Sequence, residues 1–293
     1  MRGEASQHLD LNLGIADLLG HPALGGAAIH LLPTPEAARS NLQLKDIARL
    51  MPWHNHVRPG EAIQAINHLI DEKIAGKKVF YSFYRAISLK ERTGLFHFRG
   101  KPGAPFALIC SGGGFRYVGT LHEGLPFAHY LGARGIHAFA LQYRPAGERA
   151  ASRDLAQALG WIFRNAQALE ISTRGYSVWG ASAGGRMAAN LGSYGNKNLG
   201  GEDLPQPGAL VLAYTGRDWI CASEPPTFAI AGSGDSIAPA QIMTARTKAL
   251  QAIGVDAQIL VARGVGHGFG LGTGTAAEGW IDRALDFWLR RLN

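Results

Sequence analysis

The residues best suited to chemistry form the stretch Gly180-Ala-Ser182-Ala-Gly184, which matches the pattern G-x-S-x-G. An apolar run at residues 176–179 leads directly into this stretch, and a series of small residues at 184–190 follows it. Such an order is typical of a strand, a sharp turn and a helix, with the serine exposed on the turn. The helix N-terminus beside Ser182 would favour the negative charge that develops when its hydroxyl attacks. The sequence therefore predicts that Ser182 is a nucleophile.

A serine hydroxyl is a weak nucleophile until a base accepts its proton, so a histidine and an orienting acid are also needed. His267 lies in the stretch Gly264-Val-Gly-His267-Gly-Phe-Gly270, directly after the last apolar run of the chain. Asp235 lies just after another apolar run, at residues 227–232. Serine, aspartate and histidine follow one another along the chain in an order that such triads use. We predict Ser182, Asp235 and His267 as the catalytic residues.

A glycine-rich loop, Ser111-Gly-Gly-Gly-Phe115, comes directly after the apolar run at residues 105–110. Because glycines let backbone amides come close to a reacting oxygen, this loop is typical of an oxyanion hole. We expect the amides of Gly113, Gly114 and Ala183 to hold the oxyanion. A simple glycine-rich turn is the alternative interpretation, but such a turn would not have to follow the third predicted strand.

A regular framework must position these candidates, and the chain offers one from about residue 79 onward. Eight short apolar runs are candidate strands, at residues 79–84, 94–98, 105–110, 137–144, 176–180, 209–214, 227–232 and 257–264. The first two runs are close enough to pair antiparallel. The later runs are almost continuously apolar and alternate with helical segments, which predicts a mostly parallel sheet covered by helices on both faces.

Two of the helical segments have a regular apolar stripe. Between residues 155 and 169 apolar side chains recur three and four positions apart, and Ser152 is the expected N-cap of that helix. Near the C-terminus, Thr275-Ala-Ala-Glu278 has the pattern of a capping box and is followed by an apolar stripe between residues 281 and 292.

Residues 1–76 differ from the rest of the chain. They contain a helix with Ile63, Ile66, Ile70 and Ile74 on one face, and the stretch Met51-Pro-Trp-His-Asn-His-Val57. We interpret residues 1–76 as an N-terminal extension that packs on the core and is a candidate lid. Residues 77–293 are then the catalytic domain.

The catalytic domain resembles a known superfamily from about residue 79 to the end. It is similar to the α/β-hydrolases, and more narrowly to the bacterial esterase/lipase branch with a glycine-triplet oxyanion loop, often associated with carbohydrate (xylan) acetylesterases. Besides the triad and the glycine loop, the resemblance rests on His122-Glu-Gly124 and Tyr143-Arg144. The loop departs from the pattern at Ser111, where the lipase-like branch has His and the acetylesterase-like branch has Pro.

This resemblance implies the α/β-hydrolase fold and a serine esterase that hydrolyses short-chain acyl esters through an acyl-enzyme. Carbohydrate acetates are the leading substrates. Since a fold does not fix the substrate, a peptidase or lactone hydrolase on the same triad is an alternative. A catalytically idle binding protein with the hydrolase fold is another, although such a protein has no need of the triad and the oxyanion glycines together.

The substrate is expected to meet aromatic side chains near the triad. Phe115, Tyr117 and Tyr214 are the predicted substrate-binding residues, and ordinary packing is the alternative for each. After the sixth predicted strand only residues 217–226 precede the next strand, which is too short for a folded cap. We therefore expect residues 1–76 to cover the mouth of the site in part.

Two other groups of polar residues have open interpretations. His54 and His56 have a spacing that suits a metal, but no carboxylate or cysteine nearby completes a ligand set, so a structural or lid-contacting pair is favoured. His122 and Glu123 are equally consistent with lining the pocket and with an interior hydrogen-bonded pair near the oxyanion loop. No metal or cofactor is implied.

The composition limits the partners. The chain has 293 residues, 46% hydrophobic and 17% charged, which is typical of a globular protein. Its 29 Lys and Arg exceed its 22 Asp and Glu, giving a net charge of +7, but they form no basic cluster, so nucleic-acid binding is not expected. The sequence shows no membrane span, and no signal-peptide pattern. We expect a cytoplasmic protein with a small-molecule or oligosaccharide ester as its substrate, and a homodimer stays open.

The two cysteines, Cys110 and Cys221, are too few for a disulfide framework. Cys110 ends an apolar run, so we expect a buried, reduced thiol.

Overall fold

The fold is centred on one eight-stranded sheet, and the computed structural model describes it within residues 8–84 and 93–292. The strand order is β1-β2-β4-β3-β5-β6-β7-β8. β2 pairs antiparallel with β1 and with β4, and all other neighbours are parallel. The predicted antiparallel start and mostly parallel sheet are confirmed. Residues 1–7 of the predicted extension and 85–92 of the predicted catalytic domain lie outside the described residues.

Each of the eight predicted strands is present, with small shifts at the ends. The strands are β1 (Phe80–Tyr81), β2 (Gly94–Phe98), β3 (Pro105–Cys110), β4 (His137–Gln142), β5 (Ser172–Ala181), β6 (Ala209–Ala213), β7 (Thr227–Gly232) and β8 (Ala257–Ala262). β5 begins four residues before the predicted start because Ser172 still pairs with Pro105. β4 ends two residues before its predicted end, where the amide of Arg144 donates to the Asp154 carboxylate instead of continuing the ladder.

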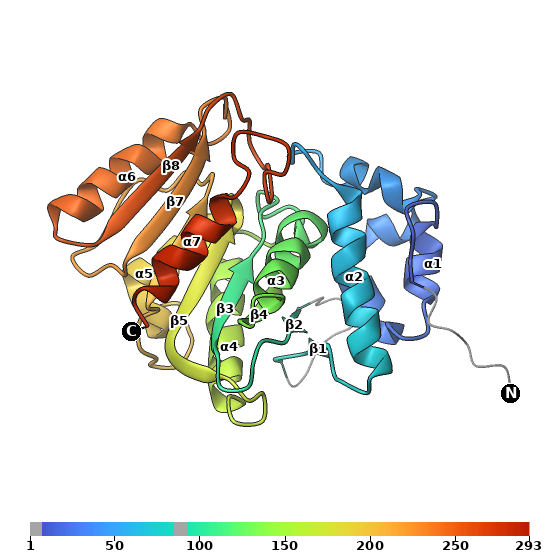
Figure 1. Cartoon of the computed structure of the whole chain (residues 1–293). Coiled ribbons are helices and arrows are strands. Elements are labelled where there is room, and N and C mark those ends of the chain that lie inside the picture. Colours follow the sequence, from blue (N-terminus) through green and yellow to red (C-terminus); the bar gives the residue numbers. More distant parts are fainter. Residues whose placement is uncertain (1–7, 85–92, 293) are drawn as a thin grey trace, which may run out of the picture.

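Both faces of the sheet are buried, because successive side chains along a strand point to opposite faces. In β3, Ala107 and Ile109 belong to one hydrophobic cluster, whereas Phe106, Leu108 and Cys110 belong to the other. Helices α2, α3 and α7 contribute to the first cluster, and α4, α5 and α6 contribute to the second (Figure 1). The predicted covering of both faces is confirmed.

The helices connect the strands and precede them. They are α1 (Ile15–Gly20), α2 (Pro59–Ile74), α3 (Leu125–Gly132), α4 (Glu148–Arg164), α5 (Ala183–Asn198), α6 (Ala240–Ala252) and α7 (Trp280–Leu289), with short 3-10 helices η1 (Gly25–Leu31), η2 (Glu36–Arg39) and η3 (Leu44–Leu50) and a π-helical turn η4 (Thr120–Gly124). α5 has a kink at Gly195, where the backbone leaves helical geometry.

Both predicted N-caps are wrong. α4 begins at Glu148, after Gly147 in a positive-φ conformation, so Ser152 lies inside the helix. α7 begins at Trp280, after Gly279 in the left-handed region. The Thr275 hydroxyl instead donates to the Gly272 carbonyl. It accepts the amide of Ala277, so the predicted capping residues stabilise a turn that precedes the helix.

The described part of the N-terminal region packs on the rest of the chain. Side chains of α1, α2 and the 3-10 helices share one hydrophobic cluster with the sheet and with α3 and α7. Ile63, Ile66 and Ile70 of α2 are buried as predicted, but Ile74 at its end is 56% exposed. In Figure 1, α2 lies beside α3, and the chain before α2 reaches across to the loop that precedes α7.

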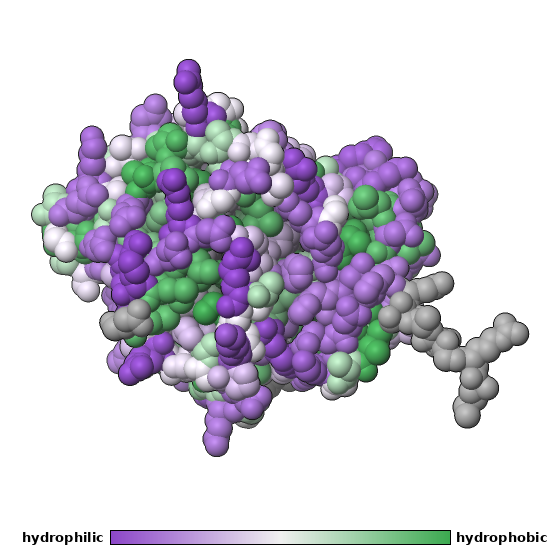
Figure 2. Space-filling view, viewed as in Figure 1, coloured by the Kyte–Doolittle hydropathy of each residue, from purple (hydrophilic) through white to green (hydrophobic). Residues whose placement is uncertain are grey.

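The surface is mixed in character. On the face seen in Figure 2, groups of hydrophobic residues lie among hydrophilic ones. Among the described residues, no helix is both long and apolar enough to cross a membrane. Cys110 is buried and carries a free thiol, as the sequence predicts.

Candidate active site

Ser182 occupies a strained turn between β5 and α5. Its backbone has φ 50° and ψ −117°, a conformation that a residue with a side chain seldom adopts. The turn is possible only because glycines flank it. A Cβ atom on Gly180 would lie 2.3 Å from the Gly184 carbonyl oxygen, and one on Gly184 would lie 2.0 Å from that of Cys110. The predicted strand, turn and helix are therefore present, with Ser182 at the start of α5.

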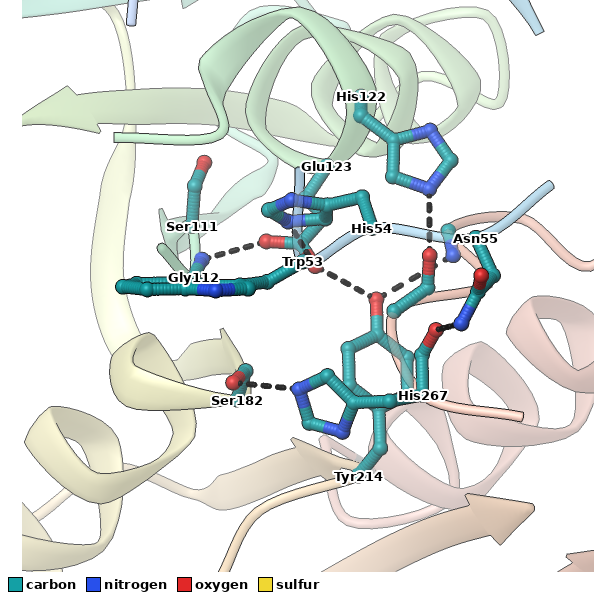
Figure 3. Close-up of polar contacts among 12 residues, drawn as sticks. Trp53, His54, Asn55, Ser111, Gly112, His122, Glu123, Ser182, Tyr214 and His267 are labelled. Carbon is teal, nitrogen blue, oxygen red and sulfur yellow. Dashed lines mark hydrogen bonds and ion pairs between the residues drawn. The ribbon is translucent and has the colours of Figure 1, made fainter. Parts of the chain in front are cut away.

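The three residues predicted as a triad form one hydrogen-bonded chain. Ser182 Oγ lies 2.8 Å from Nε2 of His267, and Nδ1 of His267 lies 2.7 Å from Oδ2 of Asp235. Figure 3 shows the imidazole of His267 turned toward Ser182. The side chains of His267 and Asp235 are 5% and 0% exposed. Such a chain can pass a proton from the serine hydroxyl to the imidazole and stabilise the imidazolium that results.

Asp235 is held by its own turn at the carboxyl end of β7. Its Oδ1 accepts the amides of Ile237 and Ala238, both at 2.8 Å, which leaves Oδ2 directed at His267. Because one carboxylate oxygen is fixed by two amides, the other cannot rotate away from the imidazole.

The predicted oxyanion donors lie on the two sides of the serine. Gly113 and Gly114 line the same pocket as Ser182, with φ of 121° and 58°. Neither of their amides donates to another residue in the described part of the chain. Ala183 is the first residue of α5, where helix amides lack partners within the helix. The amide of Gly112, by contrast, already donates to the carboxylate of Glu123.

The serine opens into a pocket of about 350 Å³. Its lining consists of Trp53, His54, Gly113, Gly114, Ser182, Ile237 and His267. Trp53 and His54 come from the N-terminal region. Neither Trp53 nor Ile237 was predicted from the sequence as a site residue. The one signal for Trp53 was its place in the aromatic and histidine stretch at 51–57.

The three aromatic residues predicted to bind substrate do not line this pocket. Tyr117 and Tyr214 are buried behind its wall, and their hydroxyls hydrogen-bond within the protein: Tyr117 with His54, and Tyr214 with Glu123. Phe115 packs against the second hydrophobic cluster. These side chains support the wall of this pocket rather than form it, and their contact with substrate stays a prediction.

The open histidine interpretations resolve toward structural roles. His54 Nε2 pairs with Glu123 at 3.0 Å, and its Nδ1 lies 2.8 Å from the Tyr117 hydroxyl. His122 Nε2 donates to the carbonyl of Gly268 at 2.9 Å. His122 and Glu123 are both buried and do not line this pocket, and each is hydrogen-bonded to other parts of the chain rather than to the other. In the ranges that the structure describes, no three His, Cys, Asp or Glu side chains gather as a metal site.

Solved structures with the α/β-hydrolase fold are similar to this chain. An α/β-hydrolase enzyme from a Medee basin deep-sea metagenome library is 22% identical, with a TM-score of 0.63 over 73% of this chain and 96% of its own. An acetyl ester-xyloside bifunctional hydrolase from Caldicellulosiruptor lactoaceticus is 21% identical, with the same TM-score and the same two coverages. A propionate-bound esterase from Thermogutta terrifontis is 17% identical, with a TM-score of 0.61 over 72% and 93%.

The chain thus has the α/β-hydrolase fold, and its similar structures include esterases. The family model BD-FAE matches residues 101–209, which include the glycine loop and the serine turn. No curated protein sequence matches the chain. The esterase from Thermogutta terrifontis has also been solved phosphonylated by cyclosarin.

Proposed function

We propose that this protein is a serine esterase that hydrolyses short-chain acyl esters through an acyl-enzyme. The observation that carries the proposal is the hydrogen-bonded chain Ser182–His267–Asp235, which opens into a pocket beside the amides of Gly113 and Gly114. The fold it shares with known esterases supports the same conclusion.

The first step is the attack of Ser182 Oγ on the ester carbonyl carbon. His267 Nε2 accepts the serine proton as the new C–O bond forms, and Asp235 stabilises the imidazolium. The negative charge moves to the carbonyl oxygen, where the amides of Gly113, Gly114 and Ala183 donate to it. His267 then gives its proton to the leaving alkoxide, so that the alcohol departs and the acyl group stays on Ser182.

The second step repeats this chemistry with water. His267 takes a proton from the water molecule, whose oxygen attacks the acyl carbon, and the same amides hold the second oxyanion. The proton returns to Ser182 Oγ as the carboxylic acid leaves.

The size of the pocket favours a short acyl group. Its volume of about 350 Å³ is near the lower end of the range of roughly 300–1,000 Å³ that is usual for ligand pockets. Trp53 and Ile237 give the pocket apolar walls, which suit an acyl chain. An acetylated sugar is the leading natural substrate, a choice supported by the similarity to the acetyl ester-xyloside hydrolase.

The test compares wild type with Ser182→Ala on p-nitrophenyl acetate, butyrate and octanoate. We expect the substitution to lower kcat by at least about 10⁴-fold, since the nucleophile itself is lost. Acetate should be hydrolysed with the highest kcat/KM, and acetylated xylo-oligosaccharides are the next substrates. Equal, slow rates for the two proteins would contradict the proposal and favour the peptidase, lactonase or binding alternatives.

A further inference from the structure

Glu123 is a buried carboxylate that the proposed mechanism does not use. It lies in η4, behind the pocket, and its side chain is 0% exposed. Three groups from distant parts of the chain donate to it. His54 Nε2 lies 3.0 Å and the Tyr214 hydroxyl 2.8 Å from Oε1, and the amide of Gly112 donates to Oε2. Figure 3 shows the carboxylate between these three donors.

The carboxylate is ionised in this position. Burial alone would raise the pKa of Glu123, but the neighbouring His54 and the amide of Gly112 lower it to about 2. An ionised carboxylate is an acceptor only, so each of its contacts orients a donor toward it. His122 is the other titratable group that faces it from η4, and burial with the charge of His54 lowers the pKa of His122 to about 4. A buried charge of this kind is costly unless all of its partners stay in place.

Two of the three donors, Gly112 and Tyr214, are next to the groups proposed to take part in catalysis. Gly112 directly precedes Gly113 and Gly114, the expected oxyanion donors. The ring of Tyr214 meets the ring of His267 edge-on, with centroids 5.3 Å apart. The Tyr214 hydroxyl also accepts the amide of Gly270, in the loop that carries His267. One carboxylate therefore links the oxyanion loop to the histidine loop.

The third donor brings the N-terminal region into the same network. His54 lines the pocket, and both of its ring nitrogens have partners, Glu123 and Tyr117. The next residue, Asn55, donates through Nδ2 to the carbonyl of His267 at 2.8 Å and through its amide to that of Gly268 at 3.1 Å. The segment 53–55 thus contacts both loops.

We propose that Glu123 is a positioning residue: by accepting from Gly112, Tyr214 and His54 at once, it fixes the oxyanion loop relative to His267 and fastens residues 53–55 across the site. It contacts no reacting atom and acts only through these donors. The inference rests on the esterase function proposed above. It assigns to the N-terminal region a share in the geometry of the reaction as well as in the wall of the pocket.

The experiment compares Glu123→Gln with Glu224→Gln. Glu224 is a matched control because it is also a buried carboxylate with an ion pair, to Arg246, and is not among the residues that line the pocket. A glutamine at 123 keeps the shape of the side chain, but it has one acceptor oxygen, so it cannot accept both from Gly112 on one side and from Tyr214 and His54 on the other. A gentler pair is Tyr214→Phe with Tyr176→Phe as control, since Tyr176 is a buried tyrosine whose hydroxyl donates to Pro205.

The main readout is kcat and KM for p-nitrophenyl acetate and for its thiono analogue, in which C=S replaces C=O. We expect Glu123→Gln to lower kcat by about 10²-fold, because small displacements of catalytic groups have effects of that size. KM should change by less than about threefold. The ratio of oxygen-ester to thiono-ester kcat should fall, since sulfur accepts the amide donors poorly and gains less from a well-placed oxyanion hole. Tyr214→Phe should show the same changes at roughly tenfold.

Unchanged kcat and an unchanged oxygen-to-thiono ratio in Glu123→Gln would overturn the inference, and so would equal losses in Glu224→Gln. If Glu123→Gln does not fold, the Tyr214→Phe and Tyr176→Phe pair decides by the same criteria. Amide hydrogen exchange of residues 112–119 gives a readout that needs no turnover, and we expect faster exchange in Glu123→Gln than in Glu224→Gln. If wild type hydrolyses esters no faster than Ser182→Ala, the proposed function is contradicted. If residues 112–119 exchange amide hydrogens at equal rates in Glu123→Gln and Glu224→Gln, the positioning role is overturned.

Discussion

Two buried hydrogen-bonded chains of side chains meet at the pocket, and each consists of a carboxylate, a histidine and a hydroxyl. In one, Asp235 holds His267, whose other nitrogen lies 2.8 Å from the Ser182 hydroxyl. In the other, Glu123 holds His54, whose other nitrogen lies 2.8 Å from the Tyr117 hydroxyl. The separations and the burial of the two pairs are similar.

The two hydrogen-bonded chains differ in the residue that supplies the hydroxyl. Ser182 stands on a strained turn at a helix N-terminus and opens into the pocket, with expected oxyanion donors beside it. Tyr117 is buried, and its oxygen also accepts the amide of Trp53. The same sequence of functional groups can therefore activate a nucleophile or simply hold two parts of a chain together. What decides is whether the hydroxyl faces the substrate.

The largest expected effect on kcat comes from replacing Asp235, the carboxylate of the first hydrogen-bonded chain. In Asp235→Asn, Oδ1 still accepts the amides of Ile237 and Ala238, so the new NH₂ group faces Nδ1 of His267. That nitrogen must then act as the acceptor, which leaves the proton on Nε2 and removes the base from Ser182. We expect kcat to fall by about 10⁴-fold with the fold intact.

Burst kinetics and circular dichroism of Asp235→Asn check this prediction. A decrease of less than about tenfold, with the spectrum of a folded protein, would mean that His267 does not need its carboxylate partner. The carboxylate of the first hydrogen-bonded chain would then have no catalytic role that distinguishes it from the carboxylate of the second.

The second expected effect concerns stability. Glu123→Gln removes the charge from a buried pair and leaves His54 without its ionic partner. Breaking a buried pair in this way costs about 3–5 kcal/mol of unfolding free energy. Urea denaturation of wild type and Glu123→Gln measures the difference. A loss below about 1 kcal/mol would show that the second chain holds the structure together less firmly than its geometry indicates.

A third expectation follows for pH. Because the folded-state pKa of Glu123 is lowered from 4.5 to about 2, its pair contributes stability above pH 4.5, and the contribution is lost as the pH falls toward 2. The unfolding free energy of wild type should therefore exceed that of Glu123→Gln at about pH 5. The difference should shrink progressively on acidification below that value. A difference that grows with acid would contradict the sign of this shift.

The contrast between the chains also explains what the sequence can reveal. Ser182, Asp235 and His267 could be predicted because each follows a strand, and the ends of parallel strands meet at one edge of a sheet. The contacts of the second chain have no such local signal. His54 meets Tyr117 across 63 positions, and the neighbouring residue Asn55 contacts His267 of the first hydrogen-bonded chain across 212.

The errors at the helix starts have a similar origin. Thr275 and Glu278 fit a capping box in spacing, but Gly279, one residue later, adopts the left-handed conformation that sets the start of α7. Hydroxyl and carboxylate side chains accept amides in turns as readily as at helix ends, so the local pattern alone does not distinguish the two. Sequence patterns thus located the strands well and the polar ends of helices less well.

A smaller effect is expected at the pocket wall that the second chain supports. Trp53 is 43% exposed, lines the pocket and packs its ring against that of Tyr117, with centroids 5.4 Å apart. Trp53→Ala should raise KM for p-nitrophenyl butyrate by about tenfold, because apolar contact worth 1–2 kcal/mol is lost, while kcat changes less. Steady-state kinetics of wild type and Trp53→Ala measure this. Equal KM values would show that Trp53, and with it this part of the N-terminal region, does not contribute to substrate binding.

The smallest expected effect gives the sharpest comparison, since Tyr117 occupies in the second chain the place that Ser182 has in the first. Tyr117→Phe keeps the ring and removes the hydroxyl from His54 and from the amide of Trp53. Losing these hydrogen bonds should cost about 1 kcal/mol of unfolding free energy and leave kcat within about threefold. Parallel assays of Tyr117→Phe and Ser182→Ala check the difference between the two hydroxyls. A loss of kcat in Tyr117→Phe that approaches the loss in Ser182→Ala would mean that the second chain takes part in proton transfer, and the division between a reacting chain and a holding chain would fail.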